Sequence, residues 1–277
     1  MITAFSCLQH RSLSDRSPYC MNGWSALILL IAAWLPSACA RFSPPDIQRD
    51  LVAEQMVAGL RLTNADLTRF KCVGKISMSS PKQPAQTFRA AMAGQLSERL
   101  RVDMFAPFGG SAGTVSSDGK HLFLVMHPSR EYYKRRFGNG SLEKMIQINV
   151  SVGDLLELLV GRIPMDAEFS ARLVPDKNEA QPHLELVDRW GRTRQRVTVD
   201  DSMHPVASVW FDSHQNPIYT LTVTGTQTIG EFVLPMRIDL SAPSGGRVSL
   251  TLDRYEVNAR FDENLFIPAP PLGSRKK

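Results

Sequence analysis

The chain has 277 residues, of which 43% are hydrophobic and 21% are charged, a composition typical of a globular protein rather than a disordered one. Its formal net charge is +5, and the basic residues are scattered between acidic ones. This excess of basic residues is too small and too dispersed to indicate nucleic-acid binding, because nucleic-acid-binding proteins concentrate Lys and Arg on one face.

An apolar run near the amino terminus, residues 24–35, is interrupted only by Ser25. It is too short to span a bilayer as a helix, but it has the length of a signal-peptide core. Small residues precede Cys39, as in the bacterial lipobox, although Pro36 stands where that motif usually has Leu. We therefore predict a lipoprotein signal peptide at residues 1–38 and lipid attachment at Cys39. An ordinary cleaved signal or a buried helix is the alternative.

A helix is expected after a lipidated tether at residues 39–45, since Pro44 and Pro45 suit a helix start. The apolar residues that follow recur at spacings of four, four and seven, which predicts one buried stripe. The members of this stripe are Val52, Met56, Leu60 and Leu67.

From Arg69 the apolar period changes to two, which predicts β-strands. The first strands are expected at residues 70–79, 86–94, 98–105, 112–117 and 121–126. Asp118 and Gly119 predict a tight type I′ hairpin between the last two. Residues 132–137 mix aromatic and basic side chains and are interpreted as a solvated strand end followed by a loop, with contact to anionic headgroups as the alternative. Further strands are expected at residues 167–174, 183–189, 194–200, 206–212, 218–225, 232–240 and 247–256.

Side-chain alternation gives this sheet one apolar and one polar face. Ile238 and Leu240 share a side with the next strand's Val248, Leu250 and Leu252. The residues on the other side are Arg237, Asp239, Arg247, Ser249 and Thr251. Cys72 falls on the same side as Phe70 and Ile76, so it is predicted to be a buried small hydrophobe. The fold class is mainly β with helices (α+β), a strongly curved antiparallel sheet of about eleven strands.

Residues 149–164 interrupt the strands and predict a short helix, with Ser151 as its N-cap, Asp154 completing a capping box, and Gly161 and Pro164 ending it. Its apolar residues surround it almost completely, so it must be enclosed against the apolar face of the sheet. Those residues are Leu155, Leu156, Leu158, Leu159 and Val160. The helix is either a plug that completes the core or one that acyl chains displace.

The stretch APFGGSAG, residues 106–113, permits two interpretations. Gly109, Ser111 and Gly113 spell the G-x-S-x-G elbow of a serine hydrolase, which requires a strand, a sharp turn and then a helix. The following residues continue as strand and hairpin, which does not favour the elbow. The other interpretation is an apolar loop tip that includes Phe105, Pro107 and Phe108. The two aromatic side chains could also fold back into the core.

The chain resembles the LolA/LolB superfamily of bacterial lipoprotein-localisation factors, and the LolB-type lipoproteins in particular. The resemblance covers residues 46–272, followed by a flexible basic tail at 273–277. It rests on the lipobox-like Cys39, the order of elements, and short runs at residues 234–240, 254–258 and 265–268. It implies an incomplete β-barrel whose apolar cavity holds the acyl chains of a lipoprotein, with a helical plug.

Several expectations follow from this resemblance. The cavity and plug would include Leu155, Leu158, Leu159, Ile238, Leu240, Val248, Leu250 and Leu252. Ala106, Pro107, Phe108 and Gly109 resemble the loop that delivers cargo into the membrane, with Phe105 assisting Phe108. The protein would sit on the periplasmic face of the outer membrane through acylated Cys39 and receive cargo from a soluble LolA-type periplasmic carrier.

Other chemistry is not indicated by the sequence. The histidines after Cys39 lack metal-ligand spacing, and the carboxylates are scattered. No catalytic residue, metal or cofactor is therefore expected. Two alternatives to the lipoprotein receptor stay open: a sensor or assembly module of the same fold that binds a protein partner, and a serine hydrolase that uses Ser111.

Overall fold

The computed structural model describes residues 50–107, 109–136, 141–175, 183–273 and 275–276. Their helices are α2 (Leu51–Leu62), α3 (Glu143–Ile146), α4 (Val152–Leu159) and the 3-10 helix η1 (Glu263–Phe266). The predicted signal peptide, Cys39 and the tether lie outside these residues. Among the described residues, no helix is both long enough and apolar enough to cross a membrane.

The strands of this part of the chain form one sheet. They are β1 (Arg69–Ser80), β2 (Gln83–Gln95), β3 (Arg99–Phe105), β4 (Ser111–Asp118), β5 (His121–Met126), β6 (Glu131–Arg136), β7 (Ser170–Val174), β8 (His183–Val187), β9 (Thr193–Val199), β10 (Pro205–Phe211), β11 (Pro217–Ile229), β12 (Phe232–Ser241), β13 (Arg247–Val257) and β14 (Arg275–Lys276). Strands β1 to β13 pair in antiparallel fashion, and the two-residue β14 pairs in parallel with β6.

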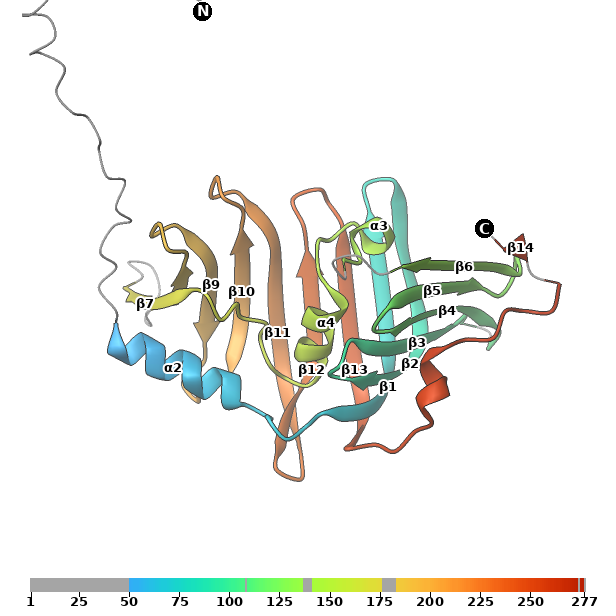
Figure 1. The fold of residues 1–277 in the computed structure, drawn as a ribbon, viewed down its shortest axis with the longest axis horizontal. Coiled ribbons are helices and arrows are strands. Elements are labelled where there is room, and N and C mark those ends of the chain that lie inside the picture. Colours follow the sequence, from blue (N-terminus) through green and yellow to red (C-terminus); the bar gives the residue numbers. More distant parts are fainter. Residues whose placement is uncertain (1–49, 108, 137–140, 176–182, 274, 277) are drawn as a thin grey trace, which may run out of the picture. The chain divides into compact units, whose positions relative to one another are not determined.

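The order of the strands explains where the helices lie. Consecutive strands are neighbours in the sheet except at β6/β7 and β13/β14; β1 pairs instead with β13, and β14 with β6. Strand β6 therefore lies near one edge of the sheet and β7 forms the other edge. The chain between them, which carries α3 and α4, must cross the sheet, and Figure 1 shows both helices lying over one of its faces.

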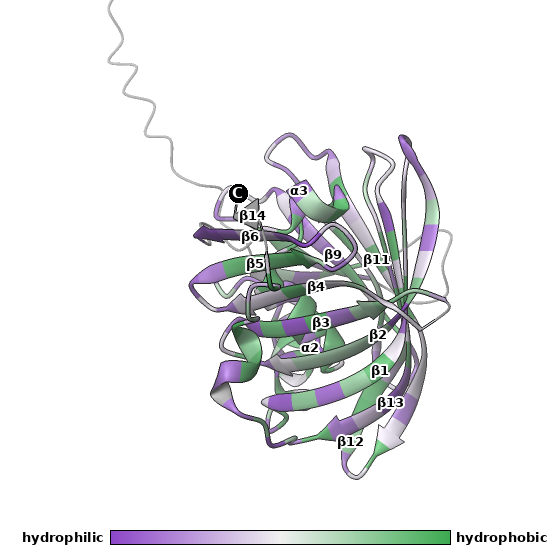
Figure 2. Cartoon of the chain, turned by 90° about the vertical axis from the view of Figure 1, so that its right-hand side faces the viewer, coloured by the Kyte–Doolittle hydropathy of each residue, from purple (hydrophilic) through white to green (hydrophobic). Residues whose placement is uncertain are grey.

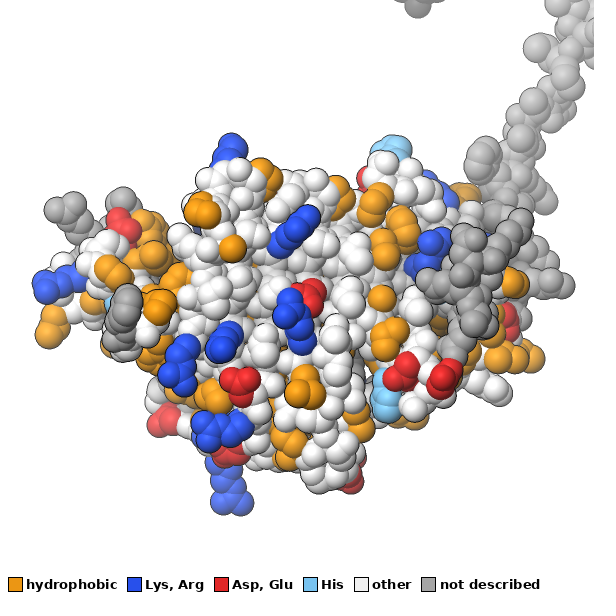
Figure 3. All heavy atoms as spheres, turned by 180° about the vertical axis from the view of Figure 1, so that it is seen from behind, with side chains coloured by type: hydrophobic (Ala, Val, Ile, Leu, Met, Phe, Trp, Pro, Cys, Tyr) orange, Lys and Arg blue, Asp and Glu red, His pale blue; other side chains and the backbone are white. Residues whose placement is uncertain are grey.

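The sheet is open and strongly curled, as Figures 1 and 2 show, and its two faces differ in polarity. Ile238, Leu240 and Leu250 are all buried on the inner face. On the outer face Arg237 donates to Asp239 at 2.7 Å, and Ser249 also donates to Asp239. Figure 3 shows basic, acidic and hydrophobic side chains interspersed over the molecule seen from behind. The predicted alternation of polar and apolar residues is thus confirmed.

The curved, mainly β antiparallel sheet is confirmed, but its strands outnumber the predicted eleven. Residues 131–136 form the full strand β6, paired with β5 from Met126↔Glu131 to His121↔Arg136, rather than a strand end and a loop. The turn between β4 and β5 is also not type I′, because Gly119 has a positive φ of 85° whereas Asp118 does not. Instead the Asp118 carboxylate accepts hydrogen bonds from the backbone N–H groups of Lys120 and His121.

The helix at the start of the described chain is shorter than predicted. Asp50 caps α2 by accepting from the N–H groups of Val52 and Ala53. Ala53, Val57 and Leu60 form its buried side, and Leu67 is buried beyond the end of the helix. The predicted stripe was wrong at Val52, which is exposed, because the burial of Ala53 and Val57 rotates the helix away from it.

The predicted helix within residues 149–164 is confirmed as α4. Ser151 accepts from the N–H of Asp154 at 2.9 Å, and the Asp154 side chain accepts from the N–H of Ser151 at 3.1 Å, which is the expected capping box. Gly161 follows the helix with a positive φ of 80°. Local sequence alone therefore defines where this helix begins and ends.

Candidate functional site

An apolar cavity of about 600 Å³ lies between the inner face of the sheet and helices α3 and α4. Strands β1 to β5, β12 and β13 contribute its walls, and α3 and α4 contribute the opposite side. Its volume is in the range of sites that bind small molecules, roughly 300–1,000 Å³. Lys144 is the one Lys, Arg, Asp or Glu among the described lining residues. Apart from Lys144, the cavity thus offers a mostly apolar surface on which a hydrocarbon would displace water.

Four methionines line this cavity, one from each of β1, β3, β5 and α3. They are Met78, Met104, Met126 and Met145. Methionine is unbranched and polarizable, so it adapts its shape to irregular apolar ligands. The sequence pattern did not predict these residues as one group, because the three strands and the helix that carry them meet only in the folded chain. The available signal was their placement near strand ends on the apolar side of each strand.

The predicted cavity residues divide into two groups. Leu155, Leu240, Val248 and Leu250 line the cavity. Leu158, Leu159, Ile238 and Leu252 instead lie in the buried core, each 2% exposed or less. Helix α4 therefore presents Leu155 to the cavity and uses its other leucines to pack against the sheet.

Helix α4 is held firmly at its carboxyl end. The Tyr255 hydroxyl donates to the carbonyl of Leu159 at 3.0 Å, and the Asn64 side-chain amide donates to the carbonyl of Val160 at 2.7 Å. Beside the helix, a Cβ atom added at Gly94 would lie 2.6 Å from a Leu156 methyl and 2.4 Å from the ring of Phe70. Of the two interpretations of this helix, this packing favours the plug that completes the core.

Helix α3 covers the cavity more loosely. It is a helix of four residues with no fully buried side chain, and it ends at Gln147 in the left-handed conformation. Met145 and Ile146 are half-buried and line the cavity, together with the buried Leu142 just before the helix. The sequence reasoning predicted no helix here, since four residues are too few to display a helical period.

The β3–β4 loop lies beside this cavity. Met104 precedes the loop, Ala112 and Gly113 follow it, and all three line the cavity. The loop closes with two hydrogen bonds, from the N–H of Ala106 to the carbonyl of Gly110 at 2.8 Å and from the N–H of Gly109 to the carbonyl of Ala106 at 2.9 Å. Pro107 is exposed and Phe105 is half-buried, while Phe108 lies outside the described residues.

Ser111 lacks the surroundings of a nucleophile elbow. It is exposed and is the first residue of β4, and that strand continues to Asp118. The sequence Gly109 to Gly113 thus leads into a strand, where the elbow requires a helix. The neighbouring His127 ring lies 3.2 Å from the hydroxyl of Thr114. Nothing in this geometry orients Ser111 as a nucleophile.

Cys72 is buried in β1, as predicted. Burial raises the pKa of its thiol well above the ordinary range, so the reactive thiolate is disfavoured. Within the described ranges, no three His, Cys, Asp or Glu side chains gather as ligands for a metal ion.

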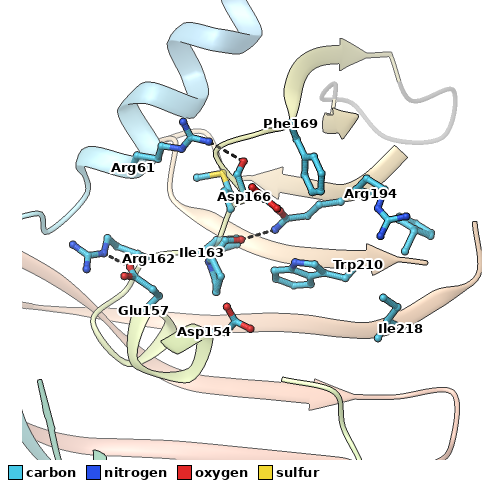
Figure 4. Close-up of a pocket in the computed structure, with 14 residues that line it drawn as sticks. Arg61, Asp154, Glu157, Arg162, Ile163, Asp166, Phe169, Arg194, Trp210 and Ile218 are labelled. Atoms are coloured by element: carbon cyan, nitrogen blue, oxygen red, sulfur yellow. Dashed lines mark hydrogen bonds and ion pairs between the residues drawn. The ribbon is translucent and has the colours of Figure 1, made fainter. Parts of the chain in front are cut away.

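A second hollow of about 740 Å³ lies on the other side of α4, among α2, the 162–169 segment and strands β9 to β11 (Figure 4). Three arginines and three carboxylates line it: Arg61, Arg162, Arg194, Asp154, Glu157 and Asp166. Arg162 pairs with Glu157, and Arg61 donates to the carbonyl of Asp166 at 3.0 Å. This charged wall suits an acyl chain far less than the mostly apolar cavity does.

These features define a class of protein, an open curled sheet that encloses an apolar cavity beneath short helices. Solved structures with this fold include the domain of a putative outer membrane lipoprotein-sorting protein from Vibrio parahaemolyticus, at a TM-score of 0.56 and 12% identity, covering 78% of this chain and 97% of that one. A LolA superfamily protein from Nitrosomonas europaea is similar at a TM-score of 0.53 and 14% identity, covering 78% and 97%.

A DUF1329 family protein from Desulfovibrio piger also shares the fold, at a TM-score of 0.56 and 11% identity, covering 78% of this chain and 95% of that one. No protein-family model matches the sequence, and no curated protein does. The likeness therefore establishes a LolA-like fold. The expected likeness to the LolB type in particular is not confirmed.

Proposed function

We propose that this protein binds the acyl chains of lipoproteins in the apolar cavity and helps to insert them into the outer membrane. The observation that carries the proposal is the mostly apolar, methionine-rich cavity of about 600 Å³ between the curled sheet and α3. Each methylene group removed from water contributes roughly 0.8 kcal/mol, so an acylated cargo needs such a shelter to cross an aqueous space. Two of the comparison proteins are described as a lipoprotein-sorting protein and a LolA superfamily protein, which supports this class of cargo.

Helix α3 is the cover that moves in this proposal, whereas α4 stays in place. None of the side chains of α3 is fully buried, while α4 buries Val152, Leu156, Leu158 and Leu159. Displacing the four residues of α3 therefore exposes less apolar surface to water than displacing α4 would. An acyl chain that enters beneath it would contact Met145 and Ile146 on one side and the β-sheet methionines on the other.

Delivery is assigned to the β3–β4 loop, with Phe108 as the side chain that enters the membrane and Phe105 and Pro107 beside it. The position of the loop supports this role, since Met104 and Ala112 line the cavity on either side of it. In this proposal Cys39 carries the lipid anchor on the periplasmic face of the outer membrane, and a soluble LolA-type carrier supplies the cargo. The transfer follows a gradient of affinity and requires no nucleotide and no catalytic residue.

The substitution Phe108→Glu tests this proposal. A charge at the loop tip should abolish the release of a lipoprotein from its carrier into liposomes, because a carboxylate does not enter the apolar region. Phe108→Leu is the matched control and should retain most of the release. Circular dichroism and thermal unfolding should show both variants to be folded like the parent protein.

Unchanged release by Phe108→Glu would refute the delivery role of the loop. Purification with a stoichiometric protein partner and no extractable acyl chain would instead favour a sensor or assembly module of the same fold. Mass spectrometry of an organic extract of the purified protein distinguishes these two outcomes.

A further inference from the structure

The outward side of α2 is uncharged along its whole length and carries large apolar side chains at both ends. Leu51, Ala58 and Leu62 recur at spacings of seven and four, so they share one side of the helix. Leu51 is 74% exposed and Leu62 is 71% exposed. Val52, 57% exposed, extends the same side. A surface helix normally presents charged or polar residues here, so this face requires an explanation.

The remaining residues of this face carry no charge. Gln55 and Gly59 are exposed between the apolar side chains. The two charged residues of the helix lie at its margins and bond back to the protein. Glu54 accepts from the N–H of Ala171 in β7 at 3.0 Å, and Arg61 donates to the carbonyl of Asp166 at 3.0 Å. We call the exposed set Leu51, Val52, Gln55, Ala58, Gly59 and Leu62 the outer α2 face.

The opposite side of α2 is already occupied by the fold. Ala53, Val57 and Leu60 are buried in the core. The carboxylate of Asp50 also accepts from the N–H of Leu173 at 3.0 Å, which ties the helix to the edge strand β7. The outer α2 face therefore cannot turn inward without breaking these contacts, and its apolar side chains stay exposed unless something covers them.

We propose that the outer α2 face lies against the membrane surface and sets the orientation of the protein on the bilayer. The inference rests on the lipid anchor included in the proposed function. Cys39 precedes Leu51 by 12 residues, so a fully extended chain could separate the anchor from the helix by roughly 40 Å at most. A helix held this close to a bilayer, with a wide uncharged apolar side, gains by burying that side in the interface.

The absence of charge on this face also predicts which lipids it accepts. Contact driven by apolar burial should be equal on zwitterionic and anionic vesicles and insensitive to salt, because screening acts on charges. A face that recognised anionic headgroups would respond to both changes. Vesicles of phosphatidylcholine are therefore the appropriate probe.

Photo-crosslinking to lipid tests the inference on the full lipidated protein. The protein is reconstituted into phosphatidylcholine vesicles that contain a diazirine-bearing phospholipid, irradiated, digested with trypsin and analysed by mass spectrometry. Trypsin releases residues 50–61 as one peptide, since Arg49 and Arg61 flank it. We expect a lipid-adduct yield on this peptide at least ten-fold above that at Met203 and Met236, which are exposed at 43% and 47% elsewhere in the fold.

A variant with Leu51→Gln, Val52→Gln and Ala58→Gln should lower this yield at least five-fold while the anchor keeps the protein on the vesicles. The control Met203→Gln with Met236→Gln should leave it unchanged. Equal adduct yields at α2 and at the two methionines would overturn the inference. The same result is expected if a second copy or another part of the chain covers α2 in place of lipid.

The same digest separates this inference from the proposed function. The tryptic peptide of residues 102–120 contains Phe108, so adducts on it report the delivery loop independently of α2. A protein that fails to float with vesicles would disprove the anchor, and the inference would fall with it. A protein that floats but gives no adducts on residues 50–61 would disprove the inference alone.

Discussion

Glu185 is a charged residue buried in the sheet, at 4% exposure. Its carboxylate accepts from Arg172 at 2.6 Å, from Arg196 at 3.0 Å and from Thr193 at 3.0 Å. Burial raises the pKa of this carboxyl group, but the hydrogen bonds from the two arginines and Thr193 outweigh burial, so its pKa lies below the ordinary value. Three neighbouring strands, β7, β8 and β9, are thereby joined at one carboxylate.

Replacing Glu185 with Gln should lower the free energy of unfolding by about 1–3 kcal/mol at pH 7, because hydrogen bonds to a charged group are lost. A carboxyl group whose pKa is lowered by folding stabilises the native state above its unfolded pKa, and this contribution disappears as the pH falls through the folded pKa. The variant should therefore lose less stability than the parent protein on acidification. Urea unfolding between pH 7 and pH 3 measures both effects.

The control for this prediction is Glu256→Gln. Glu256 forms an exposed pair with Lys71 at 3.6 Å, and such pairs contribute at most about 1 kcal/mol. Equal effects of the two substitutions would contradict the role assigned to Glu185.

At the scale of elements, Gly94 determines how closely α4 packs on β2. A side chain at Gly94 would collide with Phe70 and Leu156, the latter from α4. Gly94→Ala should therefore lower the free energy of unfolding by about 1–3 kcal/mol through overpacking. Gly110→Ala is the control, since an added Cβ there has no atom within 4 Å. Thermal and urea unfolding compare the two, and a neutral Gly94→Ala would show that α4 is not packed as described.

Helix α3 should behave differently from α4 when ligand binds. Its last-turn amides are held by single backbone hydrogen bonds, such as that from Gln147 to the carbonyl of Glu143 at 2.8 Å. Hydrogen exchange at residues 145–147 should be fast in the free protein and slow several-fold when a long-chain fatty acid is added. Exchange within α4 should be slow in both states. If ligand slowed exchange in α4 and not in α3, this result would contradict the assignment of α3 as the moving cover.

Elements and faces were predictable from sequence where the determinants are local. The alternation from Arg237 to Leu240 predicted the buried side of β12, and Ser151 with Asp154 predicted the start of α4. Strand β6 was missed because its Lys134, Arg135 and Arg136 are exposed and hide any alternation. The outward side of α2 was missed because Val52 lies four residues before Met56, which is the spacing expected of a buried apolar residue.

The composition of the cavity wall was only half predictable, for a reason that concerns the whole molecule. Leu155 and Met104 line one cavity only because β1 pairs with β13, which fixes where the segment between β6 and β7 crosses the sheet. That pairing joins strands from the two ends of the described chain, and no local pattern records it. Leu158 and Leu159 are leucines of α4 like Leu155, but they pack into the core. The rotation of α4 about its own axis decides which leucine faces the cavity, and the sequence pattern does not fix that rotation.

The central claim is that the apolar cavity holds an acyl chain, and a titration with a fluorescent long-chain fatty acid tests it most directly. Ala112 lines the cavity, and Ala85 lies exposed on β2, on the opposite side from the cavity-lining Gln86. A Trp side chain at position 112 occupies part of the cavity and narrows it, whereas one at position 85 does not reach it. We predict saturable binding to one site, weakened at least ten-fold by Ala112→Trp and unchanged by Ala85→Trp. Binding that is absent from the parent protein, or equally strong in the Ala112→Trp variant, would contradict the claim.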